Sequence, residues 1–264
     1  MGMVDTHCHA SPVWYEPVES LLHQMDRNDV ERAVLIQIRG QTNNRYQFEC
    51  VERYPDRLVS VVVVGSDGPD APRELERLAE RGARGVRLWA DTRSPGDDSL
   101  AIWRKAAELG LPVSCGGTSR EFASTEFAEL VEALPNLTLI VEHLGSVGTP
   151  DGEVAPYEVR QRVFSLARYP NVFIKVHGLG EFAKRAMPVT EPFPFETPIP
   201  PLLELAYEAF GPKRMMWGSD YPPVSRREGY RNALRLTMDQ LATKSQADRD
   251  LIFGGVASAV FRLP

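Results

Sequence analysis

The feature that most constrains the fold is a repeated alternation of short apolar runs and amphipathic runs along all 264 residues. The apolar runs are rich in β-branched residues, as expected for strands buried on both faces of a parallel sheet. Eight such runs are present, at Met3–His9, Arg32–Ile38, Leu58–Val64, Ala83–Trp89, Leu111–Cys115, Leu137–His143, Asn171–His177 and Arg214–Asp220. We therefore predict eight parallel strands.

The amphipathic runs between these strands have the composition and end signals of helices. We predict helices over Pro72–Arg81, Ser99–Leu109 and Glu121–Leu134, the first two stopped by glycine. Eight strand–helix repeats favour a (β/α)8 TIM barrel, an α/β fold that spans residues 1–264 as a single domain. A doubly wound open sheet is the alternative, but no glycine-rich phosphate loop follows the first two strands.

One segment, 178–201, interrupts the repeat and is long, proline-rich and aromatic. Irregular loops of this length in a compact domain are usually functional or disordered. Because the segment follows the seventh strand, we predict an active-site loop that acts as a lid or pocket wall. The alternative is a surface loop that packs against a neighbouring subunit in a homo-oligomer.

Composition excludes several classes of partner. The formal charge of −6 gives no basic footprint for nucleic acid. No apolar run reaches the roughly 18 residues that a membrane span requires, and the N-terminal residues do not resemble a signal peptide. The three cysteines fit neither a zinc cluster nor a disulfide framework. We expect a cytoplasmic protein whose partner is a small-molecule substrate, with no nucleic acid or membrane involved.

Polar side chains gather where the predicted strands end. Enzyme sites of TIM barrels lie at the carboxyl ends of the strands. Four of the five histidines occupy such ends, and only His23, on the first helix, is predicted to lie elsewhere. The strand-end candidates are His7, His9, Gln37, Arg39, Arg87, Trp89, Glu142, His143, Lys175, His177 and Asp220.

The first strand supplies the strongest chemical signal. Side chains two residues apart on a strand share a face, so His7 and His9 project together. Two imidazoles on a rigid strand form the start of a divalent-metal site, and they give a strand-end Asp220 possible partners. The alternatives are two histidines without a metal and an Asp220 that caps the turn before Tyr221.

The remaining candidates also have structural alternatives. His143 could be a hydrogen-bonded core histidine, and His177 could belong to a turn at Gly178. Glu142 could serve only to orient a neighbour. A buried guanidinium needs an anion, so Arg87 requires either a protein carboxylate or a substrate.

Four segments together resemble the amidohydrolase superfamily, in its amidohydrolase-related branch of lactonases and decarboxylases. They are Val4–His9, Ala83–Leu88, Leu139–Gly145 and Met216–Pro222. The resemblance covers the whole chain. It implies that His7, His9 and Asp220 are metal ligands, that Asp220 also accepts a proton, and that His143 polarises or orients the substrate.

The sequence departs from the metal-dependent relatives at three positions. The fifth strand lacks their histidine, and Cys115 stands close to its place, either as a filler or as a thiolate ligand for a soft metal. The carboxylated lysine of binuclear relatives is replaced by Arg87 and Leu88, and His177 stands where relatives often have serine. We therefore expect one divalent metal, zinc being favoured, that is weakly held or dispensable.

The expected activity is hydrolysis of a carboxylate-bearing lactone or similar cyclic ester. Asp220 would activate water, His143 would assist, and Arg87 with Arg120 or Arg226 would hold the substrate carboxylate. Further substrate contacts are predicted at His177, Trp89, Glu142 and Tyr221. A metal-dependent decarboxylase of the aminocarboxymuconate-semialdehyde type and a non-catalytic small-molecule binding barrel are the alternatives.

Overall fold

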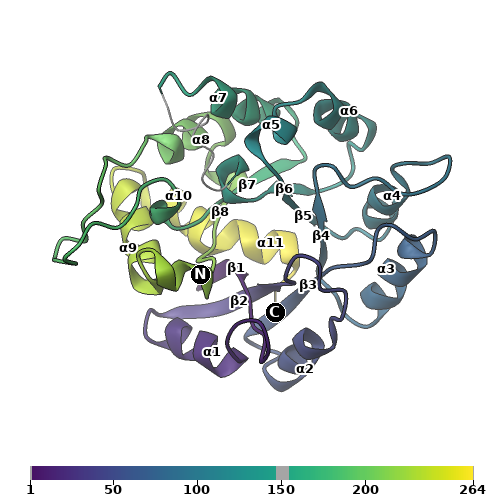
Figure 1. Ribbon diagram of the computed structural model, residues 1–264, viewed down its shortest axis with the longest axis horizontal. Coiled ribbons are helices and arrows are strands. Elements are labelled where there is room, and N and C mark those ends of the chain that lie inside the picture. Colours follow the sequence, from purple (N-terminus) through teal and green to yellow (C-terminus); the bar gives the residue numbers. More distant parts are fainter. Residues whose placement is uncertain (1, 147–154, 264) are drawn as a thin grey trace.

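The computed structural model, which describes residues 2–146 and 155–263, contains one eight-stranded parallel sheet (Figure 1). Its strands are hydrogen-bonded in chain order, from β1 to β8. They are β1 Met3–Cys8, β2 Val30–Ile36, β3 Leu58–Val62, β4 Gly85–Trp89, β5 Val113–Gly116, β6 Leu139–Val141, β7 Val172–Val176 and β8 Met215–Trp217. Residues 1, 147–154 and 264 of the predicted single domain lie outside the described part.

The last strand returns to the first and closes the barrel. A parallel bridge joins Cys8 to Tyr221, and the hydroxyl of Thr6 donates to the carbonyl of Trp217 at 2.7 Å. The amide of Asp220 donates to the carbonyl of His7 at 2.7 Å, and the amide of His9 donates to Tyr221 at 2.7 Å. The prediction of a (β/α)8 barrel is confirmed.

Helices surround the strands and pack apolar faces on them (Figure 1). They are α1 Val18–Asp26, α2 Arg45–Arg53, α3 Ala71–Glu80, α4 Ala101–Glu108, α5 Ser119–Phe122, α6 Thr125–Ala133, α7 Glu158–Phe164, α8 Leu202–Phe210, α9 Tyr230–Gln240, α10 Gln246–Asp250 and α11 Val256–Phe261. A separate buried cluster joins α11 residues Val256 and Phe261 to inward-facing Val4, Val34 and Met216. This apolar cluster fills one part of the barrel interior.

The predicted boundaries were wrong at several element ends. The predicted run Leu137–His143 contains only β6 in its middle, and Arg214–Asp220 contains only β8. His143 and Asp220 adopt left-handed backbone conformations, φ 54° and 57°, which a strand cannot continue. The predicted helix Glu121–Leu134 is two helices, because the hydroxyl of Ser124 caps the start of α6.

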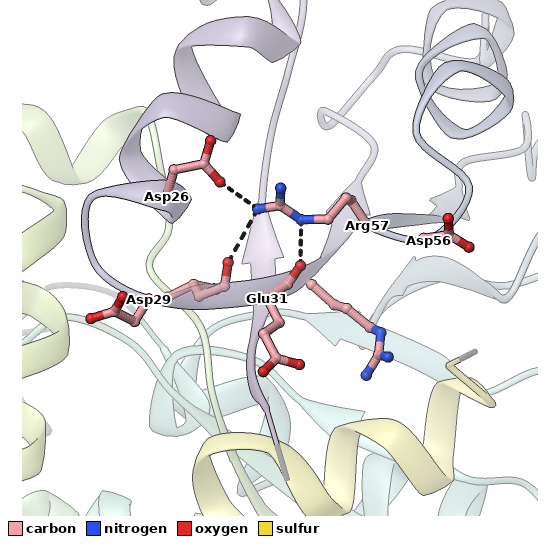
Figure 2. Close-up of a pocket in the computed structure, with 7 residues that line it drawn as sticks. Asp26, Asp29, Glu31, Asp56 and Arg57 are labelled. Carbon is pink, nitrogen blue, oxygen red and sulfur yellow. Dashed lines mark hydrogen bonds and ion pairs between the residues drawn. The ribbon is translucent and has the colours of Figure 1, made fainter.

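A hollow lies at the amino ends of β2 and β3, opposite the strand ends that carry the candidate site (Figure 2). Arg57 lies between Asp26, at 2.7 Å, and the main-chain carbonyls of Val30 and Glu31. The other labelled side chains, Asp29 and Asp56, are exposed acids. These contacts hold Arg57, which immediately precedes β3, against the end of α1 and the start of β2.

Candidate active site

The end of β1 buries two histidines with different hydrogen-bond roles. His9 Nδ1 lies 2.7 Å from the carbonyl oxygen of Ile36 on β2. Because a carbonyl only accepts, Nδ1 carries the hydrogen and Nε2 is left with a lone pair. The ring of His7 lies 5.0 Å from that of His9, and neither nitrogen of His7 has a hydrogen-bond partner among the described residues.

In the segment after β8, the carboxylate oxygen Oδ1 of Asp220 faces the rings of His7 and His9. Asp5, fully buried on β1, accepts hydrogen bonds from the amide of Ser219 at 2.8 Å and from its hydroxyl at 2.6 Å, which fixes this segment beside β1. Asp220 Oδ2 accepts from Arg227 at 2.9 Å. Oδ1 lies 3.6 Å from His9 Nε2 and 3.9 Å from His7 Nε2.

These separations fit one cation. Zinc binds histidine nitrogen and carboxylate oxygen at about 2.0–2.2 Å, so two ligands of one ion lie up to about 4 Å apart. The distances exceed a good hydrogen bond, and His9 Nε2 presents a lone pair to a carboxylate. His7 Nδ1 lies 3.7 Å from Glu142, the usual place of a carboxylate behind a histidine ligand. The donor set of His7, His9 and Asp220 therefore fits a divalent metal.

His143, from the short 3-10 turn after β6, forms a second part of the site. Its Nδ1 lies 2.7 Å from Glu181 Oε1. Burial alone would lower the pKa of His143, but the charge and hydrogen bond of Glu181, together with the charges of Asp220 and Glu142, raise it. Arg227 lies between Glu181, at 3.4 Å, and Asp220, at 2.9 Å. Burial opposes ionisation of Asp220, but the positive charges of His143 and Arg227 overcome this effect and lower its pKa to about 2.

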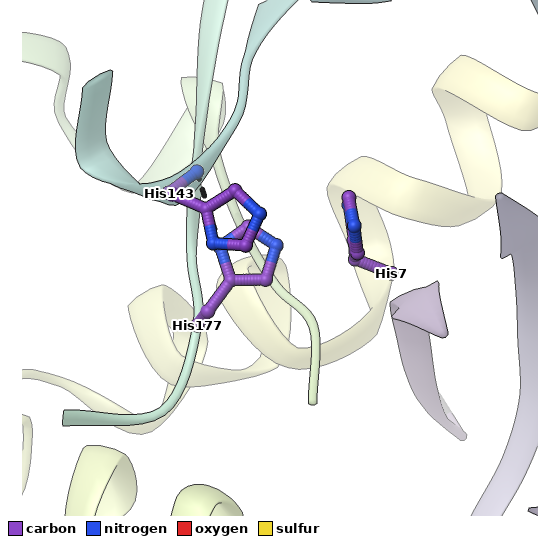
Figure 3. Close-up of side chains that lie close together, drawn as sticks. All are labelled: His7, His143 and His177. Carbon is purple, nitrogen blue, oxygen red and sulfur yellow. Dashed lines mark hydrogen bonds between the residues drawn. The ribbon is translucent and has the colours of Figure 1, made fainter. Parts of the chain in front are cut away.

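His177, just beyond β7, lies against the same cluster. Its ring stacks on that of His143 at 3.8 Å and 19°, and meets His7 edge-on at 4.5 Å (Figure 3). Its Nδ1 accepts a hydrogen bond from the main-chain amide of His143 at 3.1 Å. This contact joins the ends of β6 and β7.

Three overlapping groups of potential metal ligands occur in the described part of the chain. They are His7, His9 and Asp220; His7, His143 and His177; and His143, Glu181 and Asp220. In the third group, the guanidinium of Arg227 already supplies a cation to both carboxylates. In the second, His177 Nδ1 is occupied by an amide hydrogen. In the first group, no hydrogen bond within the described residues occupies His7 Nε2, His9 Nε2 or Asp220 Oδ1, which favours a single metal.

A buried polar layer lies beneath the histidines. Arg87 donates to Glu142 through Nε at 3.1 Å and through Nη2 at 2.8 Å, and to the carbonyl of Gln37 at 3.0 Å. Of the two partners considered for Arg87, the structure therefore shows the protein carboxylate. Burial opposes ionisation of Glu142, but the charges of Arg87 and Lys175 lower its pKa to about 2. Burial lowers the pKa of Lys175 to about 8.

The side-chain directions on β5 explain why this strand supplies no metal ligand in the described structure. Ser114 points inward, where its hydroxyl contacts Glu142 at 2.7 Å and Lys175 at 3.0 Å. Cys115 therefore points outward, into the hydrophobic core, and burial raises the pKa of its thiol well above the usual value. The filler role of Cys115 is thus favoured over a ligand role. A Cβ on Gly116 would lie 3.0 Å from the indole nitrogen of Trp89, so the tryptophan occupies the space of a side chain at this strand end.

A cleft at the mouth gives access to this cluster. Two adjoining hollows share Arg39, Trp89 and Asp91, and one reaches Arg87, Glu142 and His143. The guanidinium of Arg39 lies 5.1 Å from the centre of the Trp89 ring. Trp14 is 65% exposed, and Trp89 lines the cleft beside Arg39.

Three residues predicted to contact the substrate lie away from the cleft lining. The Tyr221 ring packs in the hydrophobic core and its hydroxyl donates to Glu16 at 2.6 Å, although its carbonyl holds His9. Arg226 is exposed, while the neighbouring Arg227 reaches Asp220. Arg120 is exposed on α5. His23 is exposed on α1, as predicted.

Sequence reasoning missed Glu181 and Arg227. Glu181 lies in the predicted active-site loop, and its side chain is fully buried beside His143. The rest of that loop projects from the barrel as an extended arm (Figure 1). A carboxylate within a few residues of a strand end was the only sequence signal for Glu181. The only sequence signal for Arg227 was its proximity to Asp220.

Within residues 2–146 and 155–263, the helices are too short or too polar to cross a membrane.

Known proteins share this architecture and sequence pattern. A 4-sulfomuconolactone hydrolase of Rhizobium radiobacter is 27% identical over 236 residues, covering 84% of this chain and 70% of the relative. An L-fucono-1,5-lactonase of Burkholderia ambifaria is 26% identical over 217 residues, covering 77% and 69%. A solved amidohydrolase of Burkholderia multivorans with bound zinc superposes with a TM-score of 0.79 at 20% identity, covering all of both chains. The family model described as amidohydrolase matches residues 4–263, and the chain thus belongs to the amidohydrolase family of hydrolytic enzymes.

Proposed function

We propose that this protein hydrolyses a carboxylate-bearing lactone or similar cyclic ester at the mouth of its barrel. The observation that carries the proposal is the position of Asp220 Oδ1, 3.6 Å from His9 Nε2 and 3.9 Å from His7 Nε2. A carboxylate, two imidazoles and an accessible cleft are the groups that water attack on an acyl carbon requires. The two relatives whose names describe lactone hydrolysis support this choice of substrate class.

Asp220 acts as the base. Arg227 occupies Oδ2, so Oδ1 is the oxygen left to take a proton from water. The low pKa of Asp220, about 2, keeps it ionised at neutral pH. Water adds to the lactone carbonyl, the ring C–O bond breaks, and the ring oxygen leaves as an alcohol after it receives a proton. His143, whose pKa is raised by Glu181, is the proton donor nearest this base.

One divalent metal, zinc first, fits His7, His9 and Asp220. When bound, such an ion polarises a carbonyl and lowers the pKa of water. The protein's own part is to fix the donors: Ile36 sets the tautomer of His9, and Glu142 lies behind His7. Three protein ligands leave one position for water or substrate.

The substrate carboxylate is held by Arg39 in this proposal. Arg87, to which the sequence assigned this task, already holds Glu142. Arg39 lines the cleft beside Trp89 and has no ion pair within the described residues. A guanidinium that stacks on an indole keeps its N–H edge available to a carboxylate.

A panel of lactones tests the proposal. Purified zinc-loaded protein is added to five- and six-membered lactones with and without a carboxylate, and acid release is followed by pH-stat. We expect turnover of carboxylated lactones and a loss of preference for them in Arg39→Gln. No acid release, together with carbon dioxide release from unsaturated carboxylates, would establish the decarboxylase instead. Neither activity, with tight ligand binding, would favour the non-catalytic barrel.

A further inference from the structure

The tautomer of His177 is determined by one main-chain contact. The amide N–H of His143 donates to His177 Nδ1 at 3.1 Å. An amide nitrogen only donates, so Nδ1 must present a lone pair. A ring with an unprotonated Nδ1 is neutral and carries its only hydrogen on Nε2. His177 is therefore a donor at Nε2, whatever else surrounds it.

This donor has no acceptor among the described residues. His177 is fully buried, and its Nε2 makes no hydrogen bond there. A buried unpaired donor costs about 1–3 kcal/mol, so such groups usually have a function. The face of the ring is covered by His143, and the edge of the ring approaches His7 (Figure 3).

The donor also lies where the reaction is proposed to occur. Nitrogen atoms of His7, His143 and His177 lie within 4.8 Å of one another, and His7 Nε2 lies 3.9 Å from Asp220 Oδ1. A metal bound at Nε2 would require the ring to lose its hydrogen, because Nδ1 has none. The geometry that resembles a second metal site is thus a hydrogen-bond donor beside the first one.

We infer that His177 donates its Nε2–H to the carbonyl oxygen of the lactone and stabilises the negative charge that forms there. This inference rests on the proposed function. Water attack moves an electron pair onto the carbonyl oxygen, and expulsion of the ring oxygen returns it. His177 keeps its hydrogen throughout, so it acts as a neutral oxyanion donor and not as an acid.

Paired substitutions test this role. His177→Phe keeps a ring against His143 but removes the donor, whereas His177→Gln keeps an N–H group at a similar reach. We expect His177→Phe to lower kcat about 10²–10³-fold with KM changed only a few-fold, as for loss of one oxyanion donor. The kcat of His177→Gln should be at least about tenfold higher than that of His177→Phe. Zinc content should match wild type in both, and His23→Phe on α1 should leave all three quantities unchanged.

Two results would overturn the inference. One is wild-type kcat in folded His177→Phe. The other is a loss of zinc that parallels the loss of activity, which would make His177 a ligand. If His177→Phe does not fold, ¹⁵N NMR of the wild-type histidines decides, since an Nδ1–H signal for His177 contradicts the inference and an Nε2–H signal supports it. A wild-type protein that opens no lactone defeats the proposed function, a result distinct from either of these.

Discussion

Two residues proposed to carry the chemistry have left-handed backbones, His143 with φ 54° and Asp220 with φ 57°. Such conformations cost side-chain-bearing residues of order 1–3 kcal/mol and concentrate at functional sites. Each one ends its strand sharply. The turned amide of Asp220 bonds to His7, and that of His143 bonds to His177. The conformation that strains each residue therefore also fixes it to a neighbouring histidine, through the main-chain carbonyl of His7 for Asp220 and through the ring of His177 for His143.

The proposed ligand set predicts how many zinc ions each chain binds. Among the described residues, His7, His9 and Asp220 form the one ligand group whose facing atoms make no hydrogen bond, so wild-type protein should retain at most one zinc ion per chain after dialysis against buffered zinc. His9→Ala removes one of three ligands and should lower zinc affinity by at least about tenfold. Atomic emission on protein dialysed in parallel measures both, with His23→Ala as control. Two ions per wild-type chain, or unchanged zinc in His9→Ala, would refute this assignment.

Glu181 should control the ionisation of His143. Glu181 is the main group that raises the pKa of His143 against the effect of burial, so Glu181→Gln should lower this pKa. A proton donor is active below its pKa, so the alkaline limb of the kcat–pH profile should move to lower pH in this variant. The matched control is Glu196→Gln, an exposed change in the same loop. Identical profiles for wild type and Glu181→Gln would show that His143 is not the donor.

Among the elements, β4, β5, β6 and β7 are joined inside the barrel by one charged layer. Arg87, Ser114, Glu142 and Lys175 each come from one of these strands or its end. Breaking a buried ion pair leaves one charge uncompensated and typically costs roughly 3–5 kcal/mol. We expect a cost of this order for the pair of Arg87 and Glu142.

Arg87→Met should therefore lower the free energy of unfolding by roughly 3–5 kcal/mol at pH 7 in urea. Arg84→Met, exposed immediately before β4, should change it by less than about 0.5 kcal/mol. The double variant Arg87→Met, Glu142→Leu should recover part of the loss, because it removes the carboxylate that Arg87→Met leaves without its guanidinium partner. A loss below about 1 kcal/mol in Arg87→Met would mean that the pair contributes no more than an exposed one.

Elements and strand-end residues could be predicted from sequence because they follow from periodicity. All eight strands were predicted, and His7, His9, His143 and Asp220 were proposed as site residues because each lies at or just beyond the end of a strand. Glu181 and Arg227 could not be found in this way. Glu181 ends the 3-10 turn Leu179–Glu181, and Arg227 follows the turn Pro223–Arg226; side-chain directions at such turns depend on the packing of the whole mouth. That dependence explains why Arg226 was preferred to Arg227.

At the scale of the whole molecule, two buried carboxylates make the stability of the fold depend on pH. Asp220 and Glu142 both have pKa values of about 2, below the ordinary 3.8 and 4.5. In each, the folded state holds the charged form better than the unfolded state does. Their contribution is therefore present above about pH 4.5 and is lost as the pH falls toward 2.

Acidification from pH 7 to pH 3 should thus lower the free energy of unfolding. Each fully buried carboxylate contributes at most roughly 2–3 kcal/mol of this change. Urea unfolding at the two pH values measures it, and Glu142→Gln should show a smaller decrease than wild type. Equal decreases in the two proteins would show that Glu142 is not the group that titrates.

The central claim is that Asp220 activates water at the lactone carbonyl, and oxygen labelling tests it most directly. Wild type and Asp220→Asn react with a carboxylated lactone in H₂¹⁸O, and mass spectrometry follows the product acid. Wild type should place one ¹⁸O in each new carboxylate, while Asp220→Asn, folded by circular dichroism, should form labelled product about 10²–10⁴-fold more slowly. Unlabelled product from wild type, or labelling by Asp220→Asn at more than about a tenth of the wild-type rate, would contradict the account.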